Sequence, residues 1–207
     1  MISLRRLLPP ILACLSLSGC FSGPTQDYRY YVLDYVPTTS KARLAQGPWP
    51  TSILVRNFTM GEAYLRPELV YRTSAHEMLY HWQHRWAVKP EQVVSDMSRK
   101  HLVEAKVFRT VQDQYDENQP AYELRGRVAS LEEYVTQDRR YAHLDLRLTF
   151  VRMSDDKVLW SQNFDVRREV VGTEPVYVVR ALSSLLEASM DRTIGAIDSV
   201  MARESIP

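Results

Sequence analysis

The chain has 207 residues, of which 45% are hydrophobic and 25% are charged, and its 26 Lys and Arg nearly balance its 25 Asp and Glu. A formal net charge of +1 gives no basic excess of the kind that nucleic-acid-binding proteins use, so no nucleic acid is expected as a partner. Two cysteines are too few for a disulfide framework, and seven glycines leave few loops that could cradle phosphate.

The N-terminal segment has the pattern of an export signal. Arg5 and Arg6 are followed by the apolar stretch LLPPILACLSLSG. This stretch is too short, and too broken by its two prolines, to cross a bilayer as a stable helix. It predicts a secretory signal peptide over residues 1–19.

The signal ends in LSGC, which resembles a bacterial lipobox. A lipobox cysteine is acylated and becomes the first residue of the mature chain, so Cys20 is the predicted lipidation site. The alternative is an ordinary signal peptide that leaves Cys20 as a free thiol, an unusual group to export. Each buried methylene of an acyl chain contributes roughly 0.8 kcal/mol, and two or more chains hold a protein firmly on a membrane.

The residue after Cys20 is Phe21, whereas an aspartate at this position is the usual signal for retention in the inner membrane of enteric-type bacteria. The sequence therefore predicts the outer membrane, on its periplasmic face. Cys14 lies in the part removed, so no cysteine remains for a disulfide or for thiol catalysis. Residues 20–27 form a lipidated tether, whose segment FSGPTQ reaches about 20 Å when extended.

Residues 28–207 are long enough for one domain with a sizeable core, and no repeat or low-complexity block divides them. Several segments in the first part have the β-branched and aromatic composition of strands. A proline-containing loop over residues 36–50 separates the first strand from the rest. The predicted strands are 28–35, 51–58, 69–72 and 76–82.

Two helices are predicted. The first begins at Pro90, where the missing N–H costs nothing and where Glu91 favours the helix N-terminus. Its apolar face comprises Val94, Met97, His101, Leu102 and Ala105. The second follows Pro175, where apolar residues recur at intervals of three and four. These residues are Val179, Leu182, Leu185, Leu186, Met190, Ile194, Ile197 and Met201.

Between these helices the apolar period changes to two, which indicates strands with one wet face. Three consecutive, turn-linked strands predict an antiparallel meander. Its expected dry face comprises Tyr122, Leu124, Gly126, Val128, Leu144, Leu146, Leu148, Phe150, Val158, Trp160, Phe164 and Val166. The predicted fold class is α+β, a single domain with a mainly antiparallel sheet and two main helices packed on one face.

The histidines do not predict a metal site. His76, His81 and His84 lie in an extended segment beside Glu77, and at these spacings their side chains are expected to point to different faces. The HExxH spacing is absent. No metal and no cofactor are expected.

The sequence offers no sign of an active site. No serine lies in a GxSxG turn, and no glycine-rich run follows a strand. The acidic pairs Asp155–Asp156 and Glu132–Glu133 are expected in a turn and at a strand end, as solvated residues. The protein is therefore not expected to be an enzyme.

The segment WQHRW, residues 82–86, is the most unusual local feature. One interpretation is that Trp82 and Trp86 both pack in the core under the first helix. The other is that Trp82, Arg85 and Trp86 belong to an exposed aromatic lip that binds a protein partner, because Trp and Arg are enriched at interface hot spots.

These segments together are similar to the ABC-type transport auxiliary lipoprotein family. A lipobox is followed by YYVLDY, by ILVRNF, by a long segment from LVYR to DMSRKHL, and then by AYELRGRV and VLWSQNFDV. The resemblance covers about residues 28–201. Its most specific part is Arg72, the aromatic-rich strand, the segment RWA and Pro90, whereas the lipobox alone is common to all lipoproteins.

The resemblance implies an outer-membrane lipoprotein that works with an MCE-domain protein and an inner-membrane ABC-type or related transporter. Such systems move lipid or other hydrophobic molecules across the periplasm, and the implied role is docking of the periplasmic MCE tunnel. The family is not catalytic, and the absence of an ATP-binding motif implies a separate ATPase. Two alternatives stay open, a periplasmic lipid-binding carrier and a pilotin-like assembly lipoprotein, as does a homo-oligomer.

Overall fold

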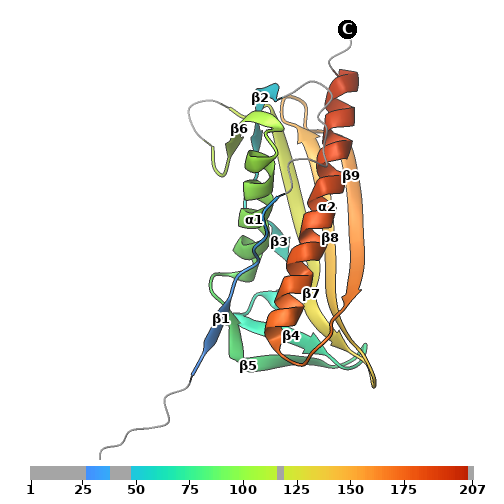
Figure 1. Ribbon diagram of the computed structural model, residues 1–207. Coiled ribbons are helices and arrows are strands. Elements are labelled where there is room, and N and C mark those ends of the chain that lie inside the picture. The colour runs from blue at the N-terminus through green and yellow to red at the C-terminus, as the bar shows by residue number, and fades with distance from the viewer. Residues whose placement is uncertain (1–26, 38–47, 116–118, 205–207) are drawn as a thin grey trace, which may run out of the picture.

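The computed structural model describes residues 27–37, 48–115 and 119–204. The predicted signal peptide, the lipidation site Cys20 and most of the tether lie outside these residues. Within them, nine strands form one curled sheet, and two helices cover one of its faces (Figure 1). The prediction of a single α+β domain is therefore confirmed.

The longest strands form the predicted meander. β7 (Tyr122–Val135), β8 (Arg140–Arg152) and β9 (Lys157–Glu169) pair antiparallel in chain order. Apolar residues alternate along them as predicted, and Leu146 and Phe150 of β8 are fully buried under the helices.

The other edge of β7 is occupied by three short strands that the sequence did not show to be its partners. β2 (Trp49–Leu54), β3 (Thr59–Met60) and β4 (Glu68–Arg72) pair in turn with the beginning, the middle and the end of β7. All three run parallel to it, and a short 3-10 helix (Glu62–Tyr64) lies between β3 and β4.

The remaining strands extend these two regions. β5 (Met78–Trp86) pairs antiparallel with β4, and β1 (Arg29–Tyr31) pairs parallel with β5. β6 (Phe108–Gln112), which was not predicted, pairs parallel with β2. β7 therefore joins two smaller sheets, β1–β5–β4 and β2–β6, to the meander.

A glycine lets the chain between β2 and β3 lie against β7. The ring of Phe58, which is buried, covers Gly126 of β7. A Cβ atom at Gly126 would lie 2.3 Å from Cγ of Phe58, so any larger residue would push this ring away.

The first strand is shorter than predicted, because the chain leaves the sheet after Tyr31 and crosses the helices. The backbone N–H of Asp34 donates to Oγ of Ser183 at 3.2 Å, and the hydroxyl of Tyr35 lies 3.0 Å from Nδ1 of His101. Residues 32–37 are therefore held by the helices and not by a neighbouring strand.

One residue of the predicted dry face is misplaced. The register between β8 and β9 shifts between Phe150 and Val151, so that Phe150 faces Trp160 while Val151 faces Val158. The additional residue, Leu159, reverses the alternation at the start of β9. Val158 is consequently 54% exposed.

The two helices match their predictions. α1 (Pro90–Glu104) and α2 (Pro175–Glu204) lie side by side on the sheet, and every residue of their predicted apolar faces is buried (Figure 1). With 30 residues, α2 is about 45 Å long and spans the molecule. No helix in the described part of the chain has the length and apolar character needed to span a membrane.

Candidate functional site

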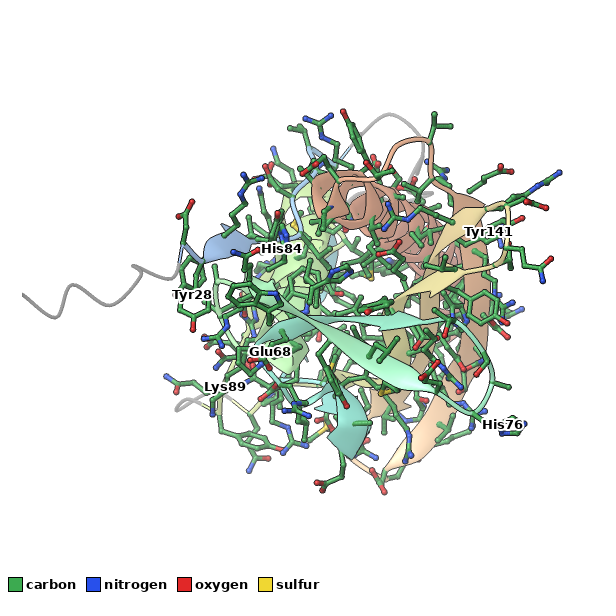
Figure 2. All side chains as sticks on the ribbon, turned by 90° about the horizontal axis from the view of Figure 1, so that it is seen from below. Tyr28, Glu68, His76, His84, Lys89 and Tyr141 are labelled. Carbon is green, nitrogen blue, oxygen red and sulfur yellow. The ribbon has the colours of Figure 1, made fainter. Side chains whose placement is uncertain are left out.

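The residues predicted to contact a partner lie at one end of the molecule, where β1, β5 and β4 are paired (Figure 2). Trp82 is 58% exposed, whereas Trp86 is 4% exposed and belongs to the core. The backbone N–H of Trp86 donates to the carbonyl of Pro67 at 2.7 Å, which fixes this part of β5 against the start of β4. Trp86 therefore packs in the core, as the first interpretation expects, and Trp82 is exposed, as the second requires, while contact of Trp82 with a protein partner stays a prediction.

Arg85 connects two strands at this end. Its guanidinium carbon lies 4.0 Å from the ring centroid of Tyr28, and its Nη2 donates to Oε1 of Glu68 at 3.0 Å. The other oxygen of Glu68 is 3.8 Å from Nε of Arg66, whose guanidinium carbon lies 4.1 Å from the ring centroid of Tyr80. We call these five residues the aromatic–arginine cluster. Each arginine lies over an aromatic ring, and the two arginines share the carboxylate of Glu68.

Two of the three histidines converge, contrary to the prediction. The ring centroids of His81 and His84 are 5.7 Å apart. The pairing of β4 with β5 shifts register between Glu68 and Leu69, and this irregularity breaks the strict alternation on which the prediction rested. Burial, followed by the nearby His81, lowers the pKa of His84. Within the described residues, no three His, Cys, Asp or Glu side chains are arranged to hold a metal ion.

The acidic pair Glu132–Glu133 was predicted to be solvated, and this prediction is wrong. Each residue is only 2% exposed. They are adjacent in β7, so their side chains point to opposite faces of the sheet and take partners from different elements. Burial of two carboxylates is tolerated because each is hydrogen-bonded and faces a basic group.

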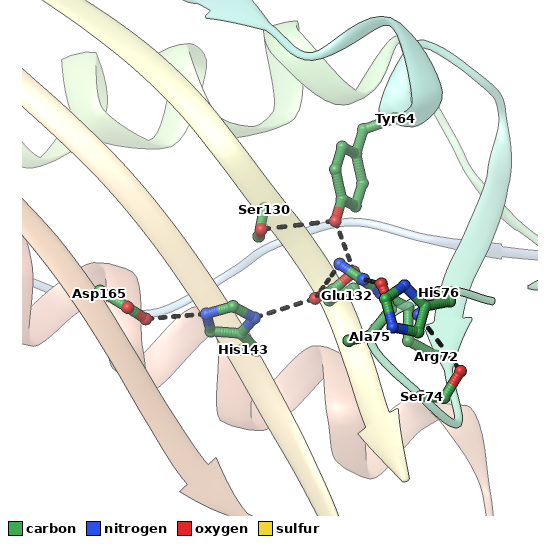
Figure 3. A network of polar contacts seen from close by, with 9 residues as sticks. All are labelled: Tyr64, Arg72, Ser74, Ala75, His76, Ser130, Glu132, His143 and Asp165. Atoms are coloured by element: carbon green, nitrogen blue, oxygen red, sulfur yellow. Dashed lines mark hydrogen bonds and ion pairs between the residues drawn. The ribbon is translucent and has the colours of Figure 1, made fainter. Parts of the chain in front are cut away.

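Glu132 is the centre of a network that crosses β4, β7, β8 and β9 (Figure 3). Its Oε2 accepts a hydrogen bond from the hydroxyl of Tyr64 at 2.5 Å. Its Oε1 lies 3.0 Å from Nδ1 of His143 and 3.8 Å from Nη1 of Arg72. The other ring nitrogen of His143 is 2.8 Å from Oδ1 of Asp165. Burial, together with the bond to Glu132, raises the pKa of Tyr64 to about 12.

Glu133 has a second set of partners. Its Oε2 is 3.1 Å from Nε2 of His81, and its Oε1 accepts a hydrogen bond from Nε of Arg140. Burial acts to raise the pKa of Glu133, but the hydrogen bonds from His81 and Arg140 outweigh it and hold this pKa below its usual range. Glu133 therefore ties β5 and the start of β8 to β7.

The pKa of His143 predicts how stability depends on pH. Burial acts to lower this pKa, but the hydrogen bonds to Glu132 and Asp165 outweigh it and raise it above the ordinary value near 6.5. The stabilisation by protonated His143 is therefore complete below about pH 6.5 and is lost as pH rises through the raised pKa. As pH rises above 6.5, we expect the free energy of unfolding to fall less for His143→Gln than for the unsubstituted protein.

Urea unfolding at several pH values from 6 to 8.5 measures this difference. His101 has a lowered pKa, mainly because of burial, and its contribution grows as pH rises toward 6.5. That contribution is present in both proteins and cancels when they are compared. A difference between the two proteins that does not change with pH would show that His143 stays neutral.

No local signal in the sequence could have revealed these networks. The partners of Glu132 come from segments separated from it by up to 68 residues. In the sequence, the pair looks like two acids at the end of an alternating strand. The pairing of β4 with β7 and the packing of β5 and α2 over this end of β7 bury it. The sequence offers one hint. Two adjacent acids in a strand lie on opposite faces of the sheet, and if both faces are covered, each acid needs a hydrogen-bond partner.

The spaces in the molecule differ in chemistry. A pocket under α2, lined by His81, Glu133 and Leu182 among others, has a volume of about 10 Å³, which is space for one water molecule. An open groove of about 880 Å³ runs beside β7 and is lined largely by polar and charged side chains, among them Arg56 and Arg125, which share the buried carboxylate of Glu123.

A smaller groove lies between the segment after β1 and helix α1. It has a volume of about 300 Å³, and its lining includes Val32, Val88, Val93 and Met97. Val32 is 53% exposed and Val88 is 47% exposed. The described surface thus offers exposed apolar side chains in an open groove beside β1.

A family model described as "ABC-type transport auxiliary lipoprotein component" matches residues 31–192 of the chain. No curated protein sequence matches the chain significantly.

Solved structures share the fold at low sequence identity. Protein XCC0632 from Xanthomonas campestris has a TM-score of 0.74 and 18% identity, with 86% of this chain and all of that chain (100%) covered. An uncharacterized protein has a TM-score of 0.64 and 11% identity, with 82% of this chain and 98% of that chain covered. These similarities show the fold alone.

Proposed function

The chain belongs to the ABC-type transport auxiliary lipoprotein family, and from this membership we propose that it is a lipid-anchored accessory component of a transporter. The system would move lipid or other hydrophobic compounds across the periplasm. In this proposal, acylated Cys20 holds the domain on the periplasmic face of the outer membrane. The folded domain then docks an MCE-domain protein that is coupled to an inner-membrane transporter.

Docking is favoured over carriage of lipid by the packing between helices and sheet. A carrier must enclose acyl chains in an apolar cavity, and lipid-sized ligand sites have volumes of hundreds of cubic ångströms. The pocket under α2 has only about 10 Å³. The groove of about 880 Å³ is open and would place an acyl chain against Arg56 and Arg125.

A non-enzymatic role fits the state of the buried acids. Glu132 and Glu133 are each bonded to a histidine and face an arginine, and these contacts join strands to one another. In this arrangement the carboxylates stabilise the fold, and neither is left as a free acid or base for a substrate.

We place the contact with the MCE-domain protein in the apolar groove beside β1. Val32→Asp introduces a charge at the exposed edge of this groove, so we expect it to abolish or strongly weaken binding while the domain stays folded. Val158→Asp is a matched control, because Val158 is exposed to the same degree, 54% against 53%, but lies on β9. Binding of purified MCE-domain protein by biolayer interferometry compares the two variants.

Equal binding by Val32→Asp and Val158→Asp would show that the MCE-domain protein does not bind in this groove. Loss of binding together with a change in sedimentation of the protein alone would identify a second copy of the chain as the occupant. Mass spectrometry of the purified protein tests the carrier alternative. Stoichiometric phospholipid that is lost in Leu182→Phe, which enlarges a residue lining the pocket under α2, would favour the carrier over the docking component.

The predicted contact residues need separate treatment. Trp86 is buried in the core and is unavailable to a partner in the folded domain. Trp82 and Arg85 lie at the end of the molecule where the chain joins the sheet, and the geometry of that end favours a different contact.

A further inference from the structure

Trp82 is the exposed member of the four tryptophans. Trp49 and Trp86 are 5% and 4% exposed, and Trp160 is half-buried against the core, whereas Trp82 is 58% exposed. Of the four indoles, that of Trp82 is therefore the one most available for contact with something outside the domain.

The position of Trp82 is tied to the path of the chain. β1 runs parallel to β5 with Arg29 opposite His84, so the chain joins the sheet two residues from Trp82 along β5. Figure 2 shows Tyr28 and His84 together on this end of the molecule. An ion pair at 3.6 Å between Arg29 and Glu174 places the start of α2 at the same end.

The length of the tether limits how far this end can be from the anchor. Six residues separate Cys20 from Asp27, the first described residue, and the seven steps from one Cα to the other reach at most about 25 Å. If Cys20 is acylated, the end that carries Trp82 is held within that distance of the bilayer. The opposite end, at the C-terminus of α2, is about 45 Å further along this helix.

Other side chains at this end of the sheet suit the boundary between lipid and water. The aromatic–arginine cluster supplies two tyrosines, each covered by an arginine. Trp and Tyr concentrate at membrane interfaces, because an apolar ring can enter the lipid while the N–H or O–H stays hydrated. Arginine can bury its alkyl chain and keep its charge at the level of the headgroups.

We propose that this end of the domain rests on the membrane that anchors it, with the indole of Trp82 inserted into the headgroup region. The proposal rests on the proposed lipid anchor at Cys20 but not on the identity of the transported molecule or on docking. It assigns adjoining surfaces of the molecule to different partners. The end of the sheet with β1 and β5 contacts phospholipid, and the apolar groove between the segment after β1 and α1 stays available to the MCE-domain protein.

Fluorescence quenching tests this contact. The lipidated protein is reconstituted in phosphatidylethanolamine and phosphatidylglycerol vesicles, and its emission is compared with that of Trp82→Phe. The difference between the two emission spectra is the contribution of Trp82, without that of the other three tryptophans. We expect brominated acyl chains to quench this component and iodide in the buffer to lose access to it.

A second reporter is the control. Trp82→Phe with Val158→Trp places an exposed tryptophan at the start of β9, where neighbouring Arg152 is paired with Glu204 at the far end of α2. This reporter should stay accessible to iodide and should not respond to brominated lipid. Such a contrast would show a defined orientation and not general proximity to the bilayer.

Two outcomes would overturn the proposal. One is a Trp82 component that stays fully accessible to iodide on vesicles. The other is a component shielded only after MCE-domain protein is added, which would assign Trp82 to the protein partner.

The test can be separated from failure of the lipidation proposal. Every element of the described fold lies after residue 26, so a chain that begins at Cys20 retains all of them. Coupling its single cysteine to a maleimide lipid supplies the anchor chemically, whether or not the cell acylates it.

Discussion

Replacement of Glu132 by alanine is expected to lower the free energy of unfolding by about 3–5 kcal/mol, the usual cost of removing one partner from a buried ion pair. The carboxylate is 2% exposed and receives contacts from Tyr64, Arg72 and His143. Without it, these three groups keep most of their desolvation cost but lose the carboxylate that they share. In a domain of this size the melting temperature should fall by about 10 °C, which differential scanning calorimetry can measure.

An exposed ion pair provides the control. Glu169 lies 3.6 Å from Arg139, with both side chains more than half exposed, at 52% and 61%. Glu169→Ala should therefore change stability by no more than about 0.5 kcal/mol. If Glu132→Ala were no more destabilising than this control, Glu132 would not be what holds β4 and β8 on β7.

Replacement of Cys20 by alanine is expected to release the folded protein from the membrane fraction into the soluble periplasmic fraction. Without the acyl chains, each of whose methylenes contributes roughly 0.8 kcal/mol when buried, the domain loses its firm attachment. The fold should be unaffected, because every described element lies after residue 26. Fractionation of cells that lack the partner proteins measures the distribution.

The other cysteine gives a matched control. Cys14 lies within the predicted signal peptide, so Cys14→Ala should leave the protein on the membrane. Membrane association of Cys20→Ala without any partner would show that the lipobox interpretation is wrong. Loss of membrane association in Cys14→Ala would instead point to failed processing of the signal.

The features that the sequence predicted well are those set by neighbouring residues. Helix α2 follows from an unbroken apolar period after Pro175, and α1 begins at Pro90 as its proline indicates. The meander follows from alternation along β7 and β8, which connect through a short turn. In these elements the residues that the apolar pattern marks are the residues that the fold buries. Local sequence and tertiary packing therefore favour the same structure.

The features that could not be predicted depend on pairing between distant segments. β2, β3 and β4 are short, and nothing in their composition shows that they lie parallel to β7. Glu132 and Glu133 were predicted to be exposed because several of their partners are distant in sequence, in the segment before β4, in β4 and in β5. A one-residue register shift in β9 reversed the expected position of Val158, and an irregularity of three extra residues in β5 changed that of His84. Neither leaves a mark in composition.

The role of β7 as the sole link between the two smaller sheets and the meander has a consequence for how the protein is made. If the chain is exported as proposed, it emerges from its N-terminus, so β2, β3 and β4 reach the periplasm before β7, the strand with which all three pair. Until Tyr122–Val135 has crossed, the segments β2, β3 and β4 expose edges that only β7 can cover. During such export the N-terminal half would keep these strand edges unpaired through most of translocation, and the sheet could close only when the residues from Tyr122 onward arrive.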